Sequence, residues 1–140
     1  MVKNQFEQVS PAVWSHSTSA TSSRVSYIEL KHFLVAVDSG WHTNVTKKAR
    51  EFIEHKTAKK VKYLILTHAH GDHIFGTKYF SDCEIVASHG TFLLVHKRIE
   101  ERENYKDKGI IIPKTTLEYT LMKQDFSILK LRMMKTLSML

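Results

Sequence analysis

Apolar positions in several parts of the chain follow the patterns that are typical of β-strands. Residues 25–30 alternate between polar and apolar side chains, and residues 33–37 follow as a continuous apolar run. Residues 61–66 form a further apolar segment and residues 84–87 a shorter one. Alternation predicts a half-buried strand, and a short continuous run is consistent with a strand buried on both faces. The sequence therefore predicts a sheet with a buried centre.

Two other segments carry the helical period. In residues 43–58 the apolar side chains recur three or four positions apart, while lysines and glutamates occupy the opposite face. This pattern predicts an amphipathic helix. Residues 91–105 predict a second helix with many charges. Strands and helices then follow one another along the chain, which favours an α/β layer with crossover connections.

The two ends of the chain are less regular. Residues 12–14 are typical of a strand, and the small polar residues 15–23 predict a turn or mobile loop. Residues 115–122 and 126–134 predict a closing pair of strands, the second with Leu129, Leu131 and Met133 alternating with Lys130 and Arg132.

Length and charge limit the classes of function. A chain of 140 residues is most simply one domain. The net charge of +7 favours attraction to anionic partners, but the lysines are spread along the chain rather than gathered in a block. We therefore interpret them as a solvated surface rather than a nucleic-acid site.

Cysteine content and hydropathy predict a compartment. The single Cys83 excludes an internal disulfide framework and fits a reducing environment. The first ten residues lack the apolar core of a secretory signal, and no stretch of about 18 apolar residues predicts a membrane span. We expect a cytoplasmic protein without membrane contact.

The candidate chemistry lies directly after the strand predicted at residues 61–66. His68, His70, Asp72 and His73 place three imidazoles and one carboxylate in six positions. Neutral imidazole and carboxylate are zinc ligands, and a turn after a strand end is where α/β folds place ligand sites. His68 and His70 are two positions apart, so both rings point the same way on an extended backbone. Gly71 permits the sharp path that follows.

These residues resemble a known motif. The segment 67–73, Thr-His-Ala-His-Gly-Asp-His, resembles the T-H-x-H-x-D-H motif of the metallo-β-lactamase superfamily. The apolar run that ends at Asp38 and Gly40 is similar to the family's strand ending in Asp-x-Gly, and residues 13–14 and 85–90 are similar to its neighbouring strands. The resemblance covers roughly residues 6–125.

The resemblance implies both a fold and a metal site. It implies the first half of an αββα sandwich, with one sheet and its covering helices. His68 and His70 would bind a first zinc ion, and Asp72 and His73 a second, with Asp72 also orienting the attacking water or accepting its proton. Asp38 would support the ligands from outside, or cap the turn. The implied activity is hydrolysis of an ester, thioester, amide or phosphodiester in a small-molecule substrate, because zinc lowers the pKa of bound water.

The sequence departs from the family pattern in its last residues. The family completes its site with later histidines and a bridging aspartate, whereas no histidine follows His96, and residues 126–140 are atypical. We therefore expect residues 1–140 to form one incomplete domain and to hold one metal with three or four ligands rather than two metals. Zinc is expected, and other divalent metals are possible. His89 is the first candidate for a substitute ligand, ahead of His16 and Cys83.

The other histidines are interpreted as surface residues: His32, His42, His55 and His96. Trp14 and Trp41 could line a cleft, although aromatic side chains beside strands are more often core. Half a sandwich also leaves an apolar sheet face uncovered, which predicts self-association through residues such as Val35, Val37, Ile65 and Leu131. Two alternatives to an enzyme therefore stay open: a non-catalytic metal-binding or interaction module, and an inactive fragment.

Overall fold

The computed structural model describes residues 6–17, 23–41 and 44–117, with side chains described as far as residue 114. These residues contain a seven-stranded sheet in which the strands follow one another in sequence order. The strands are β1 (Phe6–Ser10), β2 (Val13–Ser17), β3 (Arg24–Glu29), β4 (Leu34–Val37), β5 (Val61–Leu66), β6 (Glu84–Ser88) and β7 (Thr115–Leu117).

The sheet changes from antiparallel to parallel at β4. Each of the pairs from β1 to β4 is antiparallel, whereas β4, β5, β6 and β7 pair in parallel. Helices make the parallel crossovers: α1 (Asn44–Thr57), then α2 (Gly71–Ile74) with the short 3₁₀ helix η2 (Thr77–Phe80), then α3 (His89–Glu101) with α4 (Glu103–Lys106). The carboxyl ends of the parallel strands therefore meet at one edge of the sheet.

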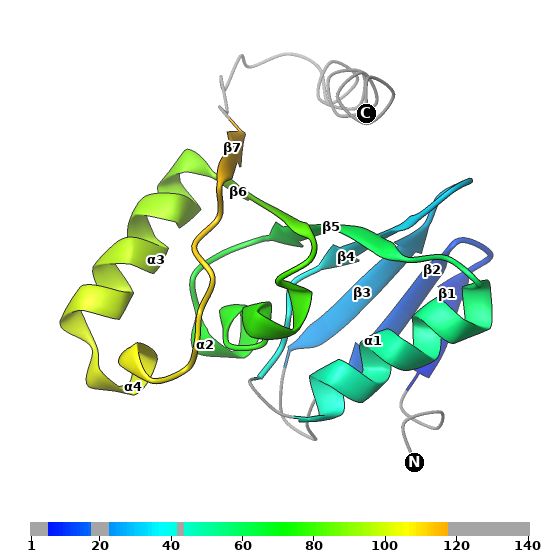
Figure 1. Ribbon diagram of the computed structural model, residues 1–140, viewed down its shortest axis with the longest axis horizontal. Helices are drawn as coiled ribbons and strands as arrows, with labels where there is room; N and C mark the ends of the chain where they lie inside the picture. Colours follow the sequence, from blue (N-terminus) through cyan, green and yellow to red (C-terminus); the bar gives the residue numbers. More distant parts are fainter. Residues whose placement is uncertain (1–5, 18–22, 42–43, 118–140) are drawn as a thin grey trace.

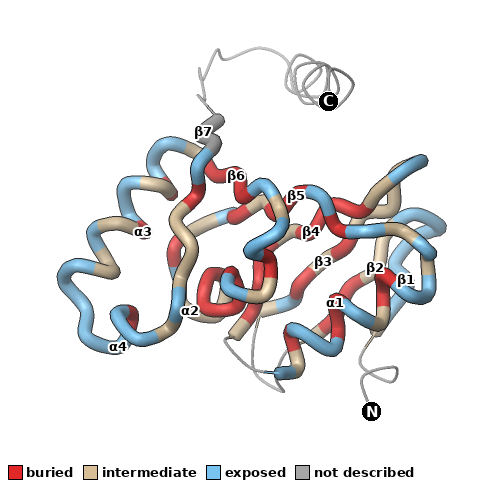
Figure 2. The backbone as a smooth tube through the Cα atoms, in the orientation of Figure 1, coloured by how far each residue is buried: buried red, intermediate tan, exposed pale blue. Residues whose placement is uncertain are grey.

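The helices gather on one face of the sheet, as expected when successive crossovers have the same hand (Figure 1). Ile53 of α1, Val95 of α3 and Tyr105 of α4 belong to one buried cluster with side chains from β3, β4, β5 and β6. Figure 2 shows buried residues along the central strands, whereas α1 and α3 carry both buried and exposed residues. The predicted α/β layer of covering helices on one sheet is confirmed.

The other face of the sheet carries a second, smaller apolar cluster. Its buried members are Val35, Tyr63 and Val86, and further strand and turn residues pack against them. In the part of the chain that the structure describes, no helix contributes to this cluster. Val35 is only 3% exposed, whereas Val37 and Ile65 are half-buried; Leu131 lies outside the described residues.

The first part of the loop predicted at residues 15–23 is a strand, and residues 18–22 lie outside the described residues. Residues 15–17 belong to β2, which pairs with β1 on one side and with β3 on the other. β1 itself was not predicted, because its side chains are mostly exposed and lack an apolar pattern. With pairing on both sides, the polar residues of β2 gain backbone partners that the sequence does not reveal. His16 is thus fully buried instead of lying in a mobile loop.

The second predicted helix is also corrected. It is divided into α3 and α4 at Arg102, whose φ of −118° and ψ of 116° are extended. Of the predicted closing strands, β7 covers Thr115–Leu117, and the remainder lies outside the described residues, as does His42. No helix in the described ranges is long and apolar enough to cross a membrane.

Candidate metal centre

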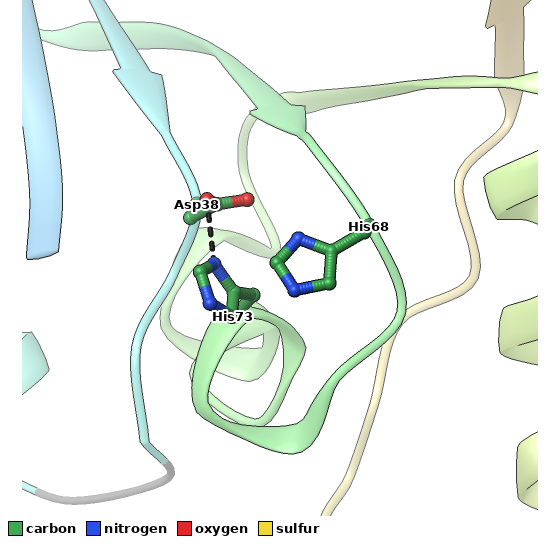
Figure 3. Close-up of side chains that lie close together, drawn as sticks. All are labelled: Asp38, His68 and His73. Atoms are coloured by element: carbon green, nitrogen blue, oxygen red, sulfur yellow. Dashed lines mark hydrogen bonds and ion pairs between the residues drawn. The ribbon is translucent and has the colours of Figure 1, made fainter. Parts of the chain in front are cut away.

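The candidate site lies at the carboxyl edge of β4 and β5. β4 ends at Val37, and Asp38 follows with a φ of 61°, a left-handed conformation that aspartate tolerates better than most residues. β5 ends at Leu66, and residues 67–70 lead into α2. Figure 3 shows His68 and His73 facing each other, with the Asp38 carboxylate beside them. Two neighbouring parallel strands therefore deliver both halves of the site to one place.

The carboxylate of Asp38 joins the two sides of this site. Its Oδ1 accepts hydrogen bonds from the backbone nitrogen of Thr67 at 2.8 Å and from the Thr67 hydroxyl at 3.0 Å. Its Oδ2 lies 2.8 Å from the same hydroxyl and 2.7 Å from Nδ1 of His73. The side chain thereby ties the end of β4 to the start of the histidine-rich segment and to α2.

These contacts fix which nitrogen of two histidines is free. His73 can donate its Nδ1 proton to Asp38, and His68 can donate its Nδ1 proton to the Thr67 hydroxyl 2.9 Å away. In each ring the lone pair is then on Nε2, which is available to a metal. A carboxylate behind the ligating imidazole, as at His73, is a usual arrangement in metal sites, because it sets the tautomer and aims the ring.

His70 and Asp72 are neighbours of His68 and His73, respectively. The ring of His70 lies 4.7 Å from that of His68, centroid to centroid, and the His73 ring lies 3.9 Å from His68 on another side. Oδ2 of Asp72 is 3.5 Å from Nε2 of His73. Two ligand atoms of one tetrahedral zinc, each about 2.0–2.2 Å from the ion, lie about as far apart as this Asp72 oxygen and His73 nitrogen.

The donor set is compatible with a metal ion. Ligand atoms of Asp38, His68 and His73 all lie within 4.8 Å of one another. Of the four ligands predicted from sequence, this group contains His68 and His73 but neither His70 nor Asp72, and it includes Asp38, which was predicted only as a support. Burial, and secondarily the neighbouring His73, lower the pKa of His68 below its ordinary value. A lowered pKa keeps this imidazole neutral, which is the form that binds metal.

The turn at the end of β4 holds α2 in place. Both the backbone nitrogen and the hydroxyl of Ser39 donate to the carbonyl of His73 at 2.8 Å. A Cβ on Gly76 would overlap the carbonyl oxygen of Ser39. Gly71 does not have a positive φ; a Cβ there would lie 2.5 Å from the Phe75 ring. Gly71 is therefore needed for close packing, which differs from the sharp backbone path expected from sequence.

The proposed substitute ligands lie elsewhere. His89 is exposed at the first position of α3, with its ring 6.2 Å from Phe92. His16 is buried in β2, with its ring 4.7 Å from Phe6. The Cys83 thiol donates to the carbonyl of Val61 at 3.2 Å, and burial raises the pKa of the thiol to about 12. In the described part of the chain, none of the three belongs to the donor group around His68.

The remaining histidines and tryptophans differ in exposure. His32 and His55 are exposed, as expected, while His96 is half-buried with its ring 4.7 Å from Phe92. Trp14 and Trp41 pack against the larger core cluster.

Sequence reasoning gave no role to two residues of the site. Thr67 bridges Asp38 and His68, and Ser39 holds the carbonyl of His73. Each of the two residues follows the end of a buried strand, and this position was the only feature of the sequence that could have indicated a role in the site. Hydroxyls are common in turns, however, so the residue type alone did not separate them from ordinary turn residues.

The fold is a mixed α/β layer with imidazoles and carboxylates at the carboxyl edge of its parallel strands, the edge at which such sheets place ligand sites. Residues 20–90 match the Metallo-beta-lactamase superfamily. The chain therefore belongs to the metallo-β-lactamase superfamily, as the motif predicted.

Individual relatives are longer than this chain. A metallo-beta-lactamase type 2 of Bacillus cereus is 31% identical over 137 residues, an alignment that covers 89% of this chain and 52% of the relative. A metallo-beta-lactamase type 2 of Bacillus sp. (strain 170) is 33% identical over 104 residues. This alignment covers 66% of the present chain and 40% of the relative. The chain thus spans about half of the length of these relatives.

Solved structures show the same fold. A metallo-beta-lactamase from Hirschia baltica matches with a TM-score of 0.64 at 22% identity, covering 80% of this chain and 51% of that one. The metallo-beta-lactamase FIM-1 from Pseudomonas aeruginosa, in its mono-zinc form, matches with a TM-score of 0.62 at 17% identity, covering 80% and 49%. The described layer therefore corresponds to part of a metallo-β-lactamase sandwich.

Proposed function

We propose that this chain is a metal-dependent hydrolase that uses a divalent ion, zinc first, to activate water. One observation carries the proposal. Ligand atoms of Asp38, His68 and His73 lie within 4.8 Å of one another at the carboxyl edge of β4 and β5, with the His70 ring next to His68 and the Asp72 carboxylate next to His73. This is the edge at which open α/β sheets bind their ligands.

The residues have distinct roles in this proposal. His68, His70, Asp72 and His73 hold the metal, with one ion on three or four of them favoured over two. A bound zinc supplies Lewis acidity and lowers the pKa of its water from 15.7 to about 7. Asp72 orients that water and accepts its proton. Asp38 aims His73, and Thr67 aims His68, each through its contact with Nδ1.

The proposed substrate is a small molecule with an ester, thioester, amide or phosphodiester bond. The names of the Bacillus relatives put the cyclic amide of a β-lactam first among them. The activity of the whole protein is part of the proposal, because the chain spans about half of those relatives. The proposal takes the cytoplasm as the compartment and includes neither membrane nor nucleic acid as a partner.

Metal content and turnover test this function together. Purified chain is dialysed against zinc, its bound metal is measured, and hydrolysis is followed with a β-lactam, a thioester and a phosphodiester. We expect weak turnover by this chain alone, and we expect His70→Ala to lose both the metal and that turnover, while His55→Ala, an exposed histidine on α1, keeps both. A chain that binds no zinc at neutral pH, or turnover that survives His70→Ala, would contradict the proposal.

A second candidate is a non-catalytic metal-binding module that associates through its sheet. The observation in its favour is the apolar cluster of Val35, Tyr63 and Val86, to which no helix of the described residues contributes. This alternative predicts that the chain binds zinc stoichiometrically but has no turnover. It also predicts that the chain sediments as a dimer and that Ile65→Lys disrupts the dimer. Leu93→Lys, at an exposed position of α3, is the matched control. A monomer at high protein concentration would argue against it.

A further inference from the structure

The backbone between the first two histidines of the motif is held by a side chain from α3. Nη1 of Arg98 donates to the carbonyl oxygen of Ala69 at 2.8 Å. The hydroxyl of Tyr105, in α4, lies 3.4 Å from the same oxygen and 3.2 Å from Nη1 of Arg98. Ala69 separates His68 from His70 and is 1% exposed. A cation and a phenol thus converge on one buried carbonyl inside the motif.

The same helix approaches the backbone on the other side of His68. The hydroxyl of Thr91, in the first turn of α3, lies 3.4 Å from the carbonyl oxygen of Thr67. Thr91 is itself fixed, because its backbone nitrogen and its hydroxyl both contact the Ser88 side chain that caps α3. The carbonyls that flank His68 therefore both meet side chains from the crossover between β6 and β7.

These contacts oppose the contacts made by β4. Asp38 holds the Thr67 nitrogen and hydroxyl from one side of the segment, while Arg98 holds the Ala69 carbonyl from the other. A hydrogen bond from a guanidinium is charge-assisted and roughly twice as strong as one between neutral groups. Arg98 is half-buried and Tyr105 is buried, so water competes weakly for this bond.

We propose that Arg98, supported by Tyr105, is a positioning residue for the segment 67–70 between β5 and α2, which we call the metal loop. By fixing the Ala69 carbonyl it sets the direction of the backbone between His68 and His70, and hence of both rings. The clamp itself depends only on the contacts of α3 and α4 with the loop. Its effect on metal binding rests on the function proposed above.

Arg102 provides a matched control. Its guanidinium lies over the same Tyr105 ring, 5.9 Å from the centroid, but the loop carbonyl is held by Arg98. Replacing either arginine by glutamine removes one positive charge near Tyr105. Only Arg98→Gln removes a hydrogen bond to the segment that carries the histidines.

The first measurement uses metal-free protein. Amide hydrogen exchange of residues 67–71 is compared in the wild type, Arg98→Gln and Arg102→Gln. We expect Arg98→Gln to exchange at least about 10-fold faster there, the factor that corresponds to one lost hydrogen bond to a charged group, and Arg102→Gln to match the wild type. Equal protection in Arg98→Gln and the wild type would overturn the clamp. If Arg98→Gln does not fold, Tyr105→Phe, which removes one hydroxyl, carries the same comparison.

The second measurement is the affinity for Co²⁺, by competition with a chromophoric chelator, together with the visible absorption of the bound ion. Arg98→Gln should bind about 10-fold more weakly, as is usual when an outer partner of a metal site is lost. Arg98→Lys should recover part of the loss, and Arg102→Gln should leave affinity and spectrum unchanged. Equal losses in both glutamine variants would refute the positioning role. The two measurements can also separate the clamp from the metal function. If the wild type bound no Co²⁺, but Arg98→Gln still exchanged faster than the wild type in residues 67–71, the proposed metal function would be contradicted and the clamp would stand.

Discussion

Asp38 shows how much one residue of the site depends on contacts that sequence does not display. The sequence left two interpretations open, a turn cap and a support for metal ligands. In the structure the carboxylate makes both kinds of contact, with the Thr67 backbone on one oxygen and His73 on the other. The motif identified His68 and His73 as candidate ligands because their spacing is local. The link to Asp38 spans 35 residues, and only the parallel pairing of β4 with β5 creates it.

Replacing Asp38 by asparagine tests its role at the residue scale. If the side-chain NH2 group of the asparagine faces His73, it cannot accept a hydrogen bond from Nδ1. The ring of His73 then loses its fixed tautomer and direction. We expect zinc affinity to fall about 10–100-fold, the usual cost of removing an outer partner. Chelator competition measures it, with Asp107→Asn, at an exposed position after α4, as the control. Complete loss of binding in a folded variant would instead make Asp38 a direct ligand.

At the scale of elements, the sequence predicted the central strands and α1 well. Residues 61–66 match β5, and the helix predicted at residues 43–58 matches α1 (Asn44–Thr57), ending one residue beyond it. These elements bury continuous or periodic apolar faces, so their pattern is local. β1 and the polar part of β2 were missed because tertiary pairing, rather than side-chain pattern, makes them strands. The break between α3 and α4 at Arg102 has no glycine or proline to announce it.

An ion network anchors α1 to the rest of the layer. Arg50, on α1, contacts Glu54 through Nε at 3.0 Å and Asp82, after η2, through Nη1 at 2.6 Å. Glu54 in turn accepts from Lys60 at 2.9 Å and from the backbone nitrogen of Val61 at 3.0 Å. The arginine and glutamate side chains are 10% and 9% exposed, so the network is largely removed from water. It ties the helix to the start of β5.

Removing Arg50 should therefore cost far more than removing a surface charge. In Arg50→Ala, Glu54 stays buried without its guanidinium partner, and we expect the free energy of unfolding to fall by about 3 kcal/mol. Urea denaturation measures the change. The control is Lys47→Ala, whose pair with Glu51 is exposed and 3.9 Å long, and which should cost no more than about 0.5 kcal/mol. Similar losses in the two variants would show that the network does not anchor the helix.

At the scale of the whole molecule, the motif predicted the family and the layer, but the contents of the two sheet faces came from the structure. The helix-covered face holds the larger cluster, and the opposite face holds a smaller one around Tyr63. The large exposed apolar residues in the described part of the chain are Val9, Leu93 and Leu94, none of which belongs to the smaller cluster. The single-domain boundary at residues 1–140 and self-association stay predictions.

Acid should destabilise the whole fold through His16. Burial, followed by the charge of Arg24, lowers the pKa of His16 to about 4 in the folded chain, against an ordinary value of about 6.5 when unfolded. Between these values the unfolded chain binds a proton that the folded chain does not. Stability conferred by the neutral ring is thus complete above pH 6.5 and is lost as pH falls toward 4. At about 1.4 kcal/mol per pKa unit, the loss over this range is about 3–4 kcal/mol.

Urea denaturation of metal-free protein at several pH values between 4 and 7 separates this effect from proton competition at the metal site. The wild type should lose stability steadily as pH falls. His16→Phe fills the same buried position beside Phe6 with an uncharged ring, so its stability should change less over the same range, whatever its value at pH 7. His55→Ala, which removes an exposed histidine, should follow the wild-type slope. If His16→Phe and the wild type lost stability in parallel, the acid sensitivity would belong to other groups and the buried imidazole would be excluded as its source.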